Sequence, residues 1–136
     1  MKSSEVIDSL TRGVPKQAEW SKGEAYGPFC VNRDSEISKV LYCVTPTRSV
    51  IQHFKKNNYD LLVSHHPFVV NDGIPQVVLH TALDCCDGGL NDQWRDAIGI
   101  LNPKHFDGTL GWHGDIDPIS FPDLIKKCEK FVGAPL

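Results

Sequence analysis

Lys39-Val40-Leu41-Tyr42-Cys43-Val44 is the first of two apolar runs that decide the fold, and Leu61-Leu62-Val63-Ser64-His65-His66-Pro67 contains the second. Short runs rich in branched, aromatic and other apolar residues predict buried β-strands, here over Lys39 to Val44 and Asp60 to Val63. Between the two runs, Pro46 can begin a helix with Thr45 as its cap, and an apolar stripe forms one helical face. A strand–helix–strand unit of this kind predicts a parallel pair of strands with a right-handed crossover.

The remaining elements follow from turn residues and apolar spacing. In chain order we predict a helix at Glu5 to Thr11, a loop at Trp20 to Phe29, a strand at Gln76 to Leu79, a helix at Asn91 to Ile98 broken by Asn102-Pro103, and an amphipathic helix at Phe121 to Phe131 between Ser120 and Gly133. Strands that alternate with helices indicate the α/β class, with a small mixed sheet and flanking helices. The length predicts one domain over residues 1–136.

Composition narrows the class of protein. The chain is 40% hydrophobic and 23% charged, which is typical of a globular protein. Its net charge of -3 and the lack of a basic cluster argue against nucleic-acid binding. No apolar stretch approaches the roughly 20 residues that cross a bilayer, and the first residues lack an apolar signal core, so we expect a cytoplasmic protein without membrane contact. Five cysteines without CxxC spacing favour neither a disulfide framework nor a zinc finger.

Two adjacent histidines, His65 and His66, follow the second apolar run. Ligands bind at the carboxyl ends of strands in open α/β sheets, and imidazole nitrogens suit zinc, iron and related metals. The alternative is a pair of polar loop histidines, one of them bonded to the backbone.

A second group of polar residues lies where the third strand is expected to end. His80 and Asp84 are four residues apart, so they share a face if the segment is helical and can still converge if it is a loop. Asp87, Asn91 and Asp92 add oxygen atoms nearby. The alternative is that Asp84 or Asp87 caps the following helix. Together with His65 and His66, this group predicts a mixed imidazole and carboxylate site for one or two divalent ions, namely zinc, iron or manganese.

At these residues the chain resembles a known family. Ser64-His65-His66-Pro67-Phe68, His80-Thr81-Ala82-Leu83-Asp84 and Gly89-Leu90-Asn91-Asp92, in this order, are similar to motifs of the NIF3-like family (NGG1-interacting factor 3-like, also known as GTP cyclohydrolase I type 2 homologues). A Gly-rich turn at Leu110 to Ile116 adds a weaker match. The resemblance implies a metal site at a strand-end cleft, often binuclear, and ring-shaped homo-oligomers. His65, His66 and Asp84 match ligand positions of the family, and His80 lies beside them as a ligand or an orienting residue.

The chain also departs from the family pattern. The remaining ligands of the family resemble a His-x-x-x-Glu pair near the C-terminus of a chain roughly twice as long, and this sequence reaches Leu136 near the end of the first half. We therefore expect those two ligands to have no counterpart here. The candidate substitutes, each more typical of a turn or a surface, are His105, His113, Asp107 and Asp115.

Three hypotheses follow. The first is a metal-dependent hydrolase, cyclohydrolase-like by family resemblance, that acts on a small nucleotide-like or phosphorylated substrate. No catalytic residue is assigned beyond the ligands. The second is a non-catalytic metal-binding or protein-interaction module, and the third is a remnant that binds no metal. In each case we expect a homo-oligomer, with a separate protein partner as a further possibility.

Overall fold

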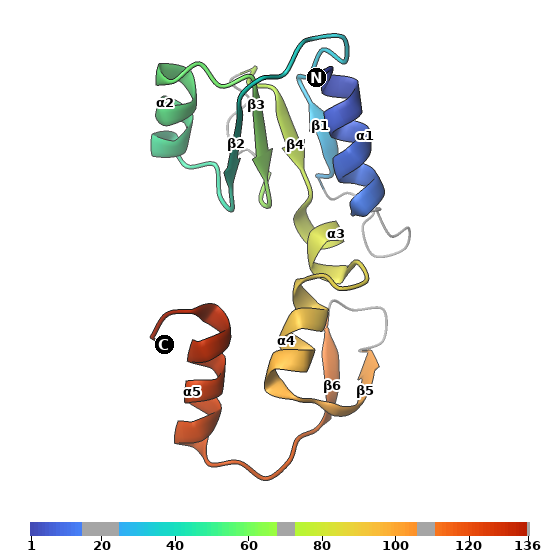
Figure 1. Cartoon of the computed structure of the whole chain (residues 1–136), viewed down its shortest axis with the longest axis vertical. Helices are drawn as coiled ribbons and strands as arrows, with labels where there is room; N and C mark the ends of the chain where they lie inside the picture. Colours follow the sequence, from blue (N-terminus) through green and yellow to red (C-terminus); the bar gives the residue numbers. More distant parts are fainter. Residues whose placement is uncertain (15–24, 68–72, 106–110, 136) are drawn as a thin grey trace. The chain divides into compact units, whose positions relative to one another are not determined.

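A computed structural model describes residues 1–14, 25–67, 73–105 and 111–135 of the chain. It forms two compact units, Met1–Leu83 and Asp84–Leu136. The elements are α1 (Ser3–Gly13), β1 (Gly27–Phe29), β2 (Val40–Cys43), α2 (Arg48–Lys56), β3 (Leu61–Ser64), β4 (Gln76–Val78), α3 (His80–Cys85), α4 (Leu90–Ile98), β5 (Leu101–His105), β6 (Trp112–Asp115) and α5 (Phe121–Val132) (Figure 1). Within the described part of the chain, no helix combines the length and the apolar character that crossing a bilayer requires.

The first unit is built on a four-stranded mixed sheet in the order β1-β4-β3-β2. Strands β2, β3 and β4 run parallel, and β1 joins β4 in the antiparallel sense. The predicted strand–helix–strand unit is therefore confirmed as β2–α2–β3, as are the third strand at β4 and the α/β class. The sequence-based interpretation of Trp20 to Phe29 as loop was wrong at Gly27–Phe29, and residues 20–24 lie outside the described residues. Pro28 is tolerated in β1 because an edge strand needs no ladder donor on its outer side.

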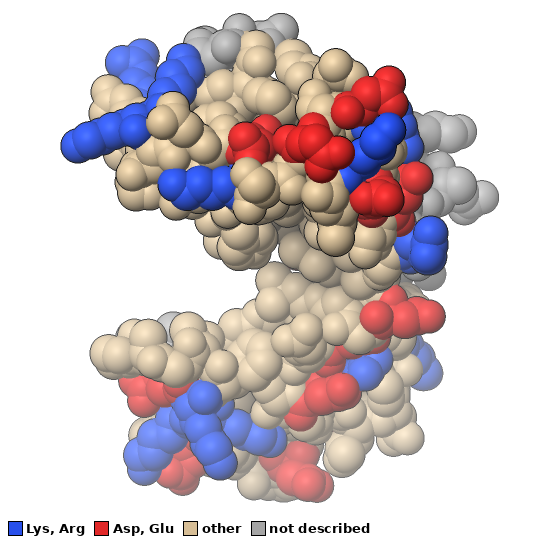
Figure 2. Space-filling model, turned by 45° about the horizontal axis from the view of Figure 1, so that its top comes forward, with Lys and Arg blue, Asp and Glu red and all other residues tan. Residues whose placement is uncertain are grey.

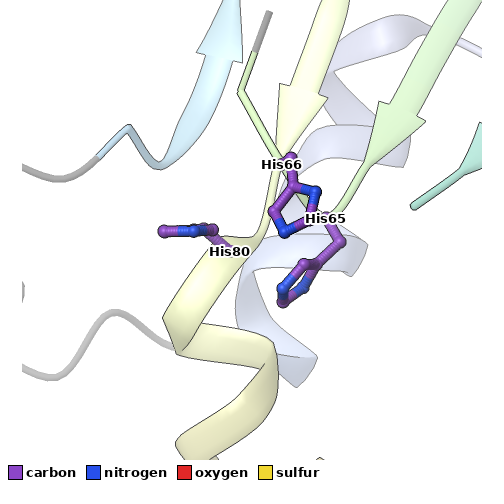
Figure 3. Close-up of side chains that lie close together, drawn as sticks. All are labelled: His65, His66 and His80. Atoms are coloured by element: carbon purple, nitrogen blue, oxygen red, sulfur yellow. The ribbon is translucent and has the colours of Figure 1, made fainter. Parts of the chain in front are cut away.

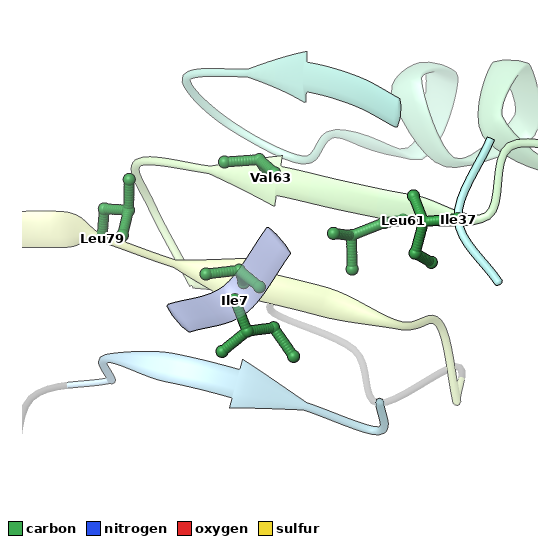
Figure 4. Packing of buried hydrophobic residues seen from close by; sticks show 6 residues of the cluster. Ile7, Ile37, Leu61, Val63 and Leu79 are labelled. Atoms are coloured by element: carbon green, nitrogen blue, oxygen red, sulfur yellow. The ribbon is translucent and has the colours of Figure 1, made fainter. Parts of the chain in front are cut away.

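Both faces of the central strand β3 are covered by a helix. On one face α1 contributes Ile7 to a core with residues of β3 and β4 (Figure 4). On the other face Ile51 and Phe54 of α2 pack on Leu62. Every residue of β3 is consequently buried, as is typical of a parallel strand between two helical layers.

The start of α2 differs from the prediction. Thr47, not Thr45, caps this helix, and its side chain accepts a hydrogen bond from the backbone N–H of Val50 at 3.4 Å. Thr45 lies before the cap, and its hydroxyl lies 2.7 Å from Nδ1 of His66 instead. The helix ends at Lys56 with Asn57 as its C-cap, and Asn58, the next residue, adopts a positive φ of 52°.

The second unit holds α4, α5 and a two-stranded sheet of β5 and β6. Trp94 of α4 and Phe131 of α5 pack edge to face with ring centroids 4.6 Å apart. The predicted helices are confirmed. Ser120 caps the start of α5 and accepts a hydrogen bond from the Asp123 N–H, and Gly133 caps its end.

Two predictions for this unit were wrong. Asn102-Pro103 does not end α4, because α4 already ends at its C-cap Gly99, which has the left-handed conformation. Asn102 and Pro103 lie within β5, at a register shift between Leu101 and Lys104. The expected Gly-rich turn over Leu110 to Ile116 contains strand β6 (Trp112–Asp115). A Cβ on Gly114 would collide with the Leu101 carbonyl, so the glycine allows the two strands to approach closely.

Candidate metal centre

Three histidines converge at the carboxyl ends of two parallel strands. His65 and His66 directly follow β3, and His80 begins α3 shortly after the neighbouring strand β4. Their ring centroids are 4.7 to 5.8 Å apart, and one ligand atom from each ring lies within 4.8 Å of the others (Figure 3). All three side chains are half-buried. Among the described residues, this is the group of donors that could share one metal ion.

The backbone of all three histidines is held by hydrogen bonds. The N–H groups of His65 and His66 donate to the carbonyls of Cys43 and Val44, at 3.2 and 2.8 Å. The N–H of His80 donates to the His65 carbonyl at 3.0 Å. The hydrogen bonds between the parallel strands therefore continue beyond the strand ends, and they fix the backbone positions from which the three histidine side chains extend.

A buried polar pair supports the turn beneath His66. Nε2 of Gln76 donates to the Ser64 hydroxyl at 2.6 Å, and this hydroxyl donates to the His66 carbonyl at 2.6 Å. Gln76 is 3% exposed and Ser64 is fully buried. Sequence reasoning missed both residues, although a serine and a glutamine within apolar strands are a signal, because buried polar groups need partners.

The ring of His66 is oriented by Thr45. The Thr45 hydroxyl lies 2.7 Å from Nδ1 of His66. An imidazole whose first nitrogen is hydrogen-bonded presents its second nitrogen to a metal, and such partners fix the ring's orientation. Thr45 therefore acts on the site rather than on the helix that follows it.

His80 has an unusual backbone. Its φ is +30°, in a region that residues other than glycine rarely adopt. The tight turn between β4 and α3 places its side chain beside His65 and His66 (Figure 3). Such conformations cost free energy and cluster at functional sites.

Asp84, the fourth predicted ligand, lies one turn after His80 in α3. The segment from His80 to Asp84, for which the sequence allowed either a helix or a loop, is therefore helical. It is half-buried and belongs to the second compact unit, and it is not part of the three-histidine group. Its role as a ligand stays a prediction. The alternative, that Asp84 or Asp87 caps α4, is wrong, because Gly89 holds the cap position and makes no side-chain cap bond.

Other candidates in the second unit have structural contacts. Asp92 accepts hydrogen bonds from Trp112 Nε1 at 2.8 Å, from Arg95 at 3.0 Å and from the Gly88 N–H at 2.9 Å. The His105 ring stacks on Trp112 at 3.5 Å between centroids. His113 and Asp115 lie in β6, and Asp107 lies outside the described residues.

The surroundings of Cys86, two residues after Asp84, disfavour its thiolate form. Burial raises the pKa of the Cys86 thiol, and the carboxylates of Asp87, Asp92 and Asp84 raise it further. A raised pKa keeps the thiol protonated near neutral pH, whereas the thiolate is the form that binds metals.

Comparison with known proteins identifies the family. The family model described as Duf34/NIF3 (NGG1p interacting factor 3) matches residues 1–73, more than half of the chain. The chain belongs to the Duf34/NIF3 family. This confirms the resemblance carried by the His65-His66-Pro67 motif.

Several Duf34/NIF3 relatives are named GTP cyclohydrolase 1 type 2 homolog. The protein of that name from Methanocaldococcus jannaschii is 29% identical over 97% of this chain and 62% of its own length. The one from Methanothermobacter thermautotrophicus is 46% identical over 50% of this chain and 27% of its own length. This Duf34/NIF3 chain thus spans less than two thirds of these relatives.

Solved structures agree with the fold. Reduced HcgD from Methanocaldococcus jannaschii superposes with a TM-score of 0.79 and 29% identity, covering 96% of this chain and 60% of that protein. The protein TTHA1606 from Thermus thermophilus shares the fold with a TM-score of 0.70 at 17% identity, over 98% of this chain and 62% of its own.

Proposed function

We propose that this Duf34/NIF3 chain binds one divalent transition-metal ion through His65, His66 and His80. The observation that carries the proposal is the approach of their ligand atoms to within 4.8 Å of one another. In a tetrahedral zinc site, nitrogens bound at about 2.0–2.1 Å lie about 3.4 Å apart, so small side-chain rotations bring three imidazoles into range. Three imidazoles favour zinc or iron, whereas manganese prefers oxygen ligands and would depend on Asp84.

A metal-dependent hydrolase is the activity that such a site suits best. Three protein ligands leave a coordination position open, and a bound ion there lowers the pKa of water toward neutrality. The chain's own residues position the ligands: Thr45 orients the His66 ring, and Ser64 fixes its backbone. The shared name of the relatives, GTP cyclohydrolase 1 type 2 homolog, supports a small nucleotide-like or phosphorylated substrate.

A non-catalytic metal-binding or protein-interaction module is the second candidate. Identified partners of the site include the hydroxyls of Thr45 and Ser64 and the amide of Gln76 behind them. Groups of this kind hold metal ligands in place, which is what a metal-binding module requires.

Metal content tests the site itself. The protein is purified without an affinity tag, and its bound metals are measured by mass spectrometry beside His65→Ala, His66→Ala and His80→Ala. The control is His53→Ala, because His53 lies on α2 and contacts Tyr59 and Asn57 instead. We expect about one ion per chain in the wild type and the control and a clear loss of bound metal in each site variant. Equal metal in all five proteins would overturn the proposal.

Activity then separates the two candidates. The metal-loaded protein is assayed on phosphoesters, nucleotides and cyclic amides. Turnover that disappears in His65→Ala and persists in His53→Ala supports the hydrolase, and bound metal without any turnover supports the non-catalytic module. The variant Asp84→Ala, measured in both assays, tests the fourth ligand that the family resemblance implies.

Self-association is a further expectation. The family resemblance implies ring-shaped homo-oligomers. Several large apolar side chains are exposed in this chain, including Phe121 at 74%. Light scattering coupled to size exclusion measures the mass in solution, and a monodisperse monomer would contradict the expectation.

A further inference from the structure

One edge of the four-stranded sheet is open. The N–H of Asp60 donates to the Lys39 carbonyl at 2.8 Å, and the N–H of His65 donates to the Cys43 carbonyl. Odd-numbered positions along β2 therefore face β3, and the regular register leaves the backbone groups of Val40 and Tyr42 pointing away from the sheet. In the part of the chain that the structure describes, no strand pairs with this side of β2.

The side chains along this edge are apolar and accessible. Val40, Tyr42 and Val44 are 43%, 61% and 55% exposed. Proteins usually protect an edge strand with charged residues, proline or a bulge, since an unprotected edge pairs with other chains. Residues 40–44 contain no charged residue and no proline, and the β2–β3 register has no irregularity. This edge therefore has the properties of an interaction surface.

The charge around the edge indicates the chemistry of its partner. From Lys39 to Tyr59 the sequence has four basic residues and no Asp or Glu. The neighbouring carboxylate of Asp60 is engaged by the N–H groups of Ser38 and Lys39. Figure 2 shows basic side chains gathered at the end of the first unit that carries α2. Acidic groups flanking a docked strand would be attracted to this segment. A second copy that docked through its own β2 would instead bring two basic segments together.

We propose that β2 docks a segment of a separate protein in extended conformation, with apolar residues at alternate positions and Asp or Glu at its flanks. The segment adds a strand to the sheet: its backbone bonds to the outward groups of Val40 and Tyr42, and its side chains cover the exposed apolar ones. The inference stands apart from metal binding, because it uses the opposite side of β2 from the one that holds His65.

A synthetic peptide tests the proposal directly. The probe is a fluorescein-labelled peptide with the sequence Asp-Asp-Val-Thr-Val-Thr-Val-Asp-Asp, and the matched control carries Lys at the four Asp positions. Fluorescence anisotropy against the full chain gives both dissociation constants. We expect the acidic peptide to bind at least about tenfold more tightly than the basic one and to lose affinity as salt is raised. Equal affinity of the two peptides, or no saturable binding of the acidic one, would overturn the proposal.

Variants of the edge locate the binding. Tyr42→Pro removes an outward N–H without breaking the ladder to β3, and Tyr42→Phe is its control. Val40→Asp places a negative charge on the edge without removing a backbone donor, and this charge repels the acidic flanks of the peptide. We expect Tyr42→Pro and Val40→Asp each to weaken binding of the acidic peptide by about tenfold, whereas Tyr42→Phe binds like the wild type. Val40→Asp keeps the test decisive should Tyr42→Pro fail to fold.

Two results would contradict the assignment. Unchanged binding in Val40→Asp would place the peptide elsewhere. A wild-type dimer in sedimentation analysis that dissociates in Val40→Asp would show that a second copy, not a separate acidic segment, occupies the edge.

Discussion

The hydroxyl of Ser64 donates a hydrogen bond to the carbonyl of His66, two residues further along the chain, at 2.6 Å. The same hydroxyl accepts from Nε2 of Gln76, so one buried side chain joins the core of the sheet to the turn that carries two of the proposed ligands. Structural stability and metal affinity are thereby linked through a single group.

Replacing Ser64 by Ala is expected to affect both properties. It leaves the Gln76 amide buried without this partner, which costs about 1–3 kcal/mol in the free energy of unfolding. It also releases the His66 carbonyl, and the loss of such outer contacts weakens metal affinity by about 10–100-fold. Urea unfolding of the metal-free protein and titration with zinc measure the two effects.

A double variant separates these effects. Ser64→Ala combined with Gln76→Met removes both polar partners, so stability should recover relative to Ser64→Ala alone. Metal affinity should stay low, because the bond to the His66 carbonyl is still missing. Recovery of metal affinity together with stability would show that Ser64 acts on folding alone.

Acid should destabilise the first unit partly through Asp60. Hydrogen bonds from the Ser38 N–H, the Ser38 hydroxyl and the Lys39 N–H lower the pKa of this carboxyl. A lowered pKa contributes stability that is present above the ordinary pKa, near 4, and is lost as pH falls through the folded-state value. Thermal unfolding from pH 6 to pH 2 should therefore show a steeper decline for the wild type than for Asp60→Asn, and parallel curves would contradict this assignment.

Gly114→Ala should destabilise the second unit. The added Cβ collides with the Leu101 carbonyl and with the Ile100 side chain, and overpacking of this kind costs about 1–3 kcal/mol. Gly13→Ala is the matched control, because a Cβ there has no atom within 4 Å and Gly13 lies in the last turn of α1. Differential scanning calorimetry should show a lower Tm for the first variant and an unchanged or higher Tm for the second.

His80→Gly should be more stable than His80→Ala when both are free of metal. Glycine adopts a positive φ without the steric cost that a Cβ brings, a difference of about 1 kcal/mol. Both variants lack the imidazole and should lose metal equally. Guanidinium unfolding checks the order of stability, and equal midpoints would show that the backbone at residue 80 relaxes without strain.

The sequence allowed the centre of the fold to be predicted, because buried parallel strands are continuous apolar runs. The strands β3 (Leu61–Ser64) and β4 (Gln76–Val78) carry that signal. The helix α2, between β2 and β3, has a clear apolar stripe. The edge strands β1 and β5 were missed, since Pro28 and Pro103 are typical of turns, and an edge position that tolerates proline depends on the assembled sheet.

The site was predicted in part for the same reason. His65, His66 and His80 follow strands whose ends must meet, so their approach follows from the parallel pairing. Thr45, Ser64 and Gln76 were not predicted as supporting residues, because their contacts depend on the register of neighbouring strands and on side-chain rotamers. Hydrogen bonds at that scale leave only a weak trace in the sequence, namely a polar residue where an apolar one would be expected.

The positive φ of His80 indicates a trade-off between stability and function at the start of α3. A glycine at this position would relieve the backbone, and an asparagine would tolerate it, yet neither side chain offers an imidazole. Substitutions that stabilise a protein at such positions often reduce its activity. An engineering effort that ranks variants of this chain by thermal stability alone would therefore tend to replace His80 early and remove the proposed centre while it improved the scaffold.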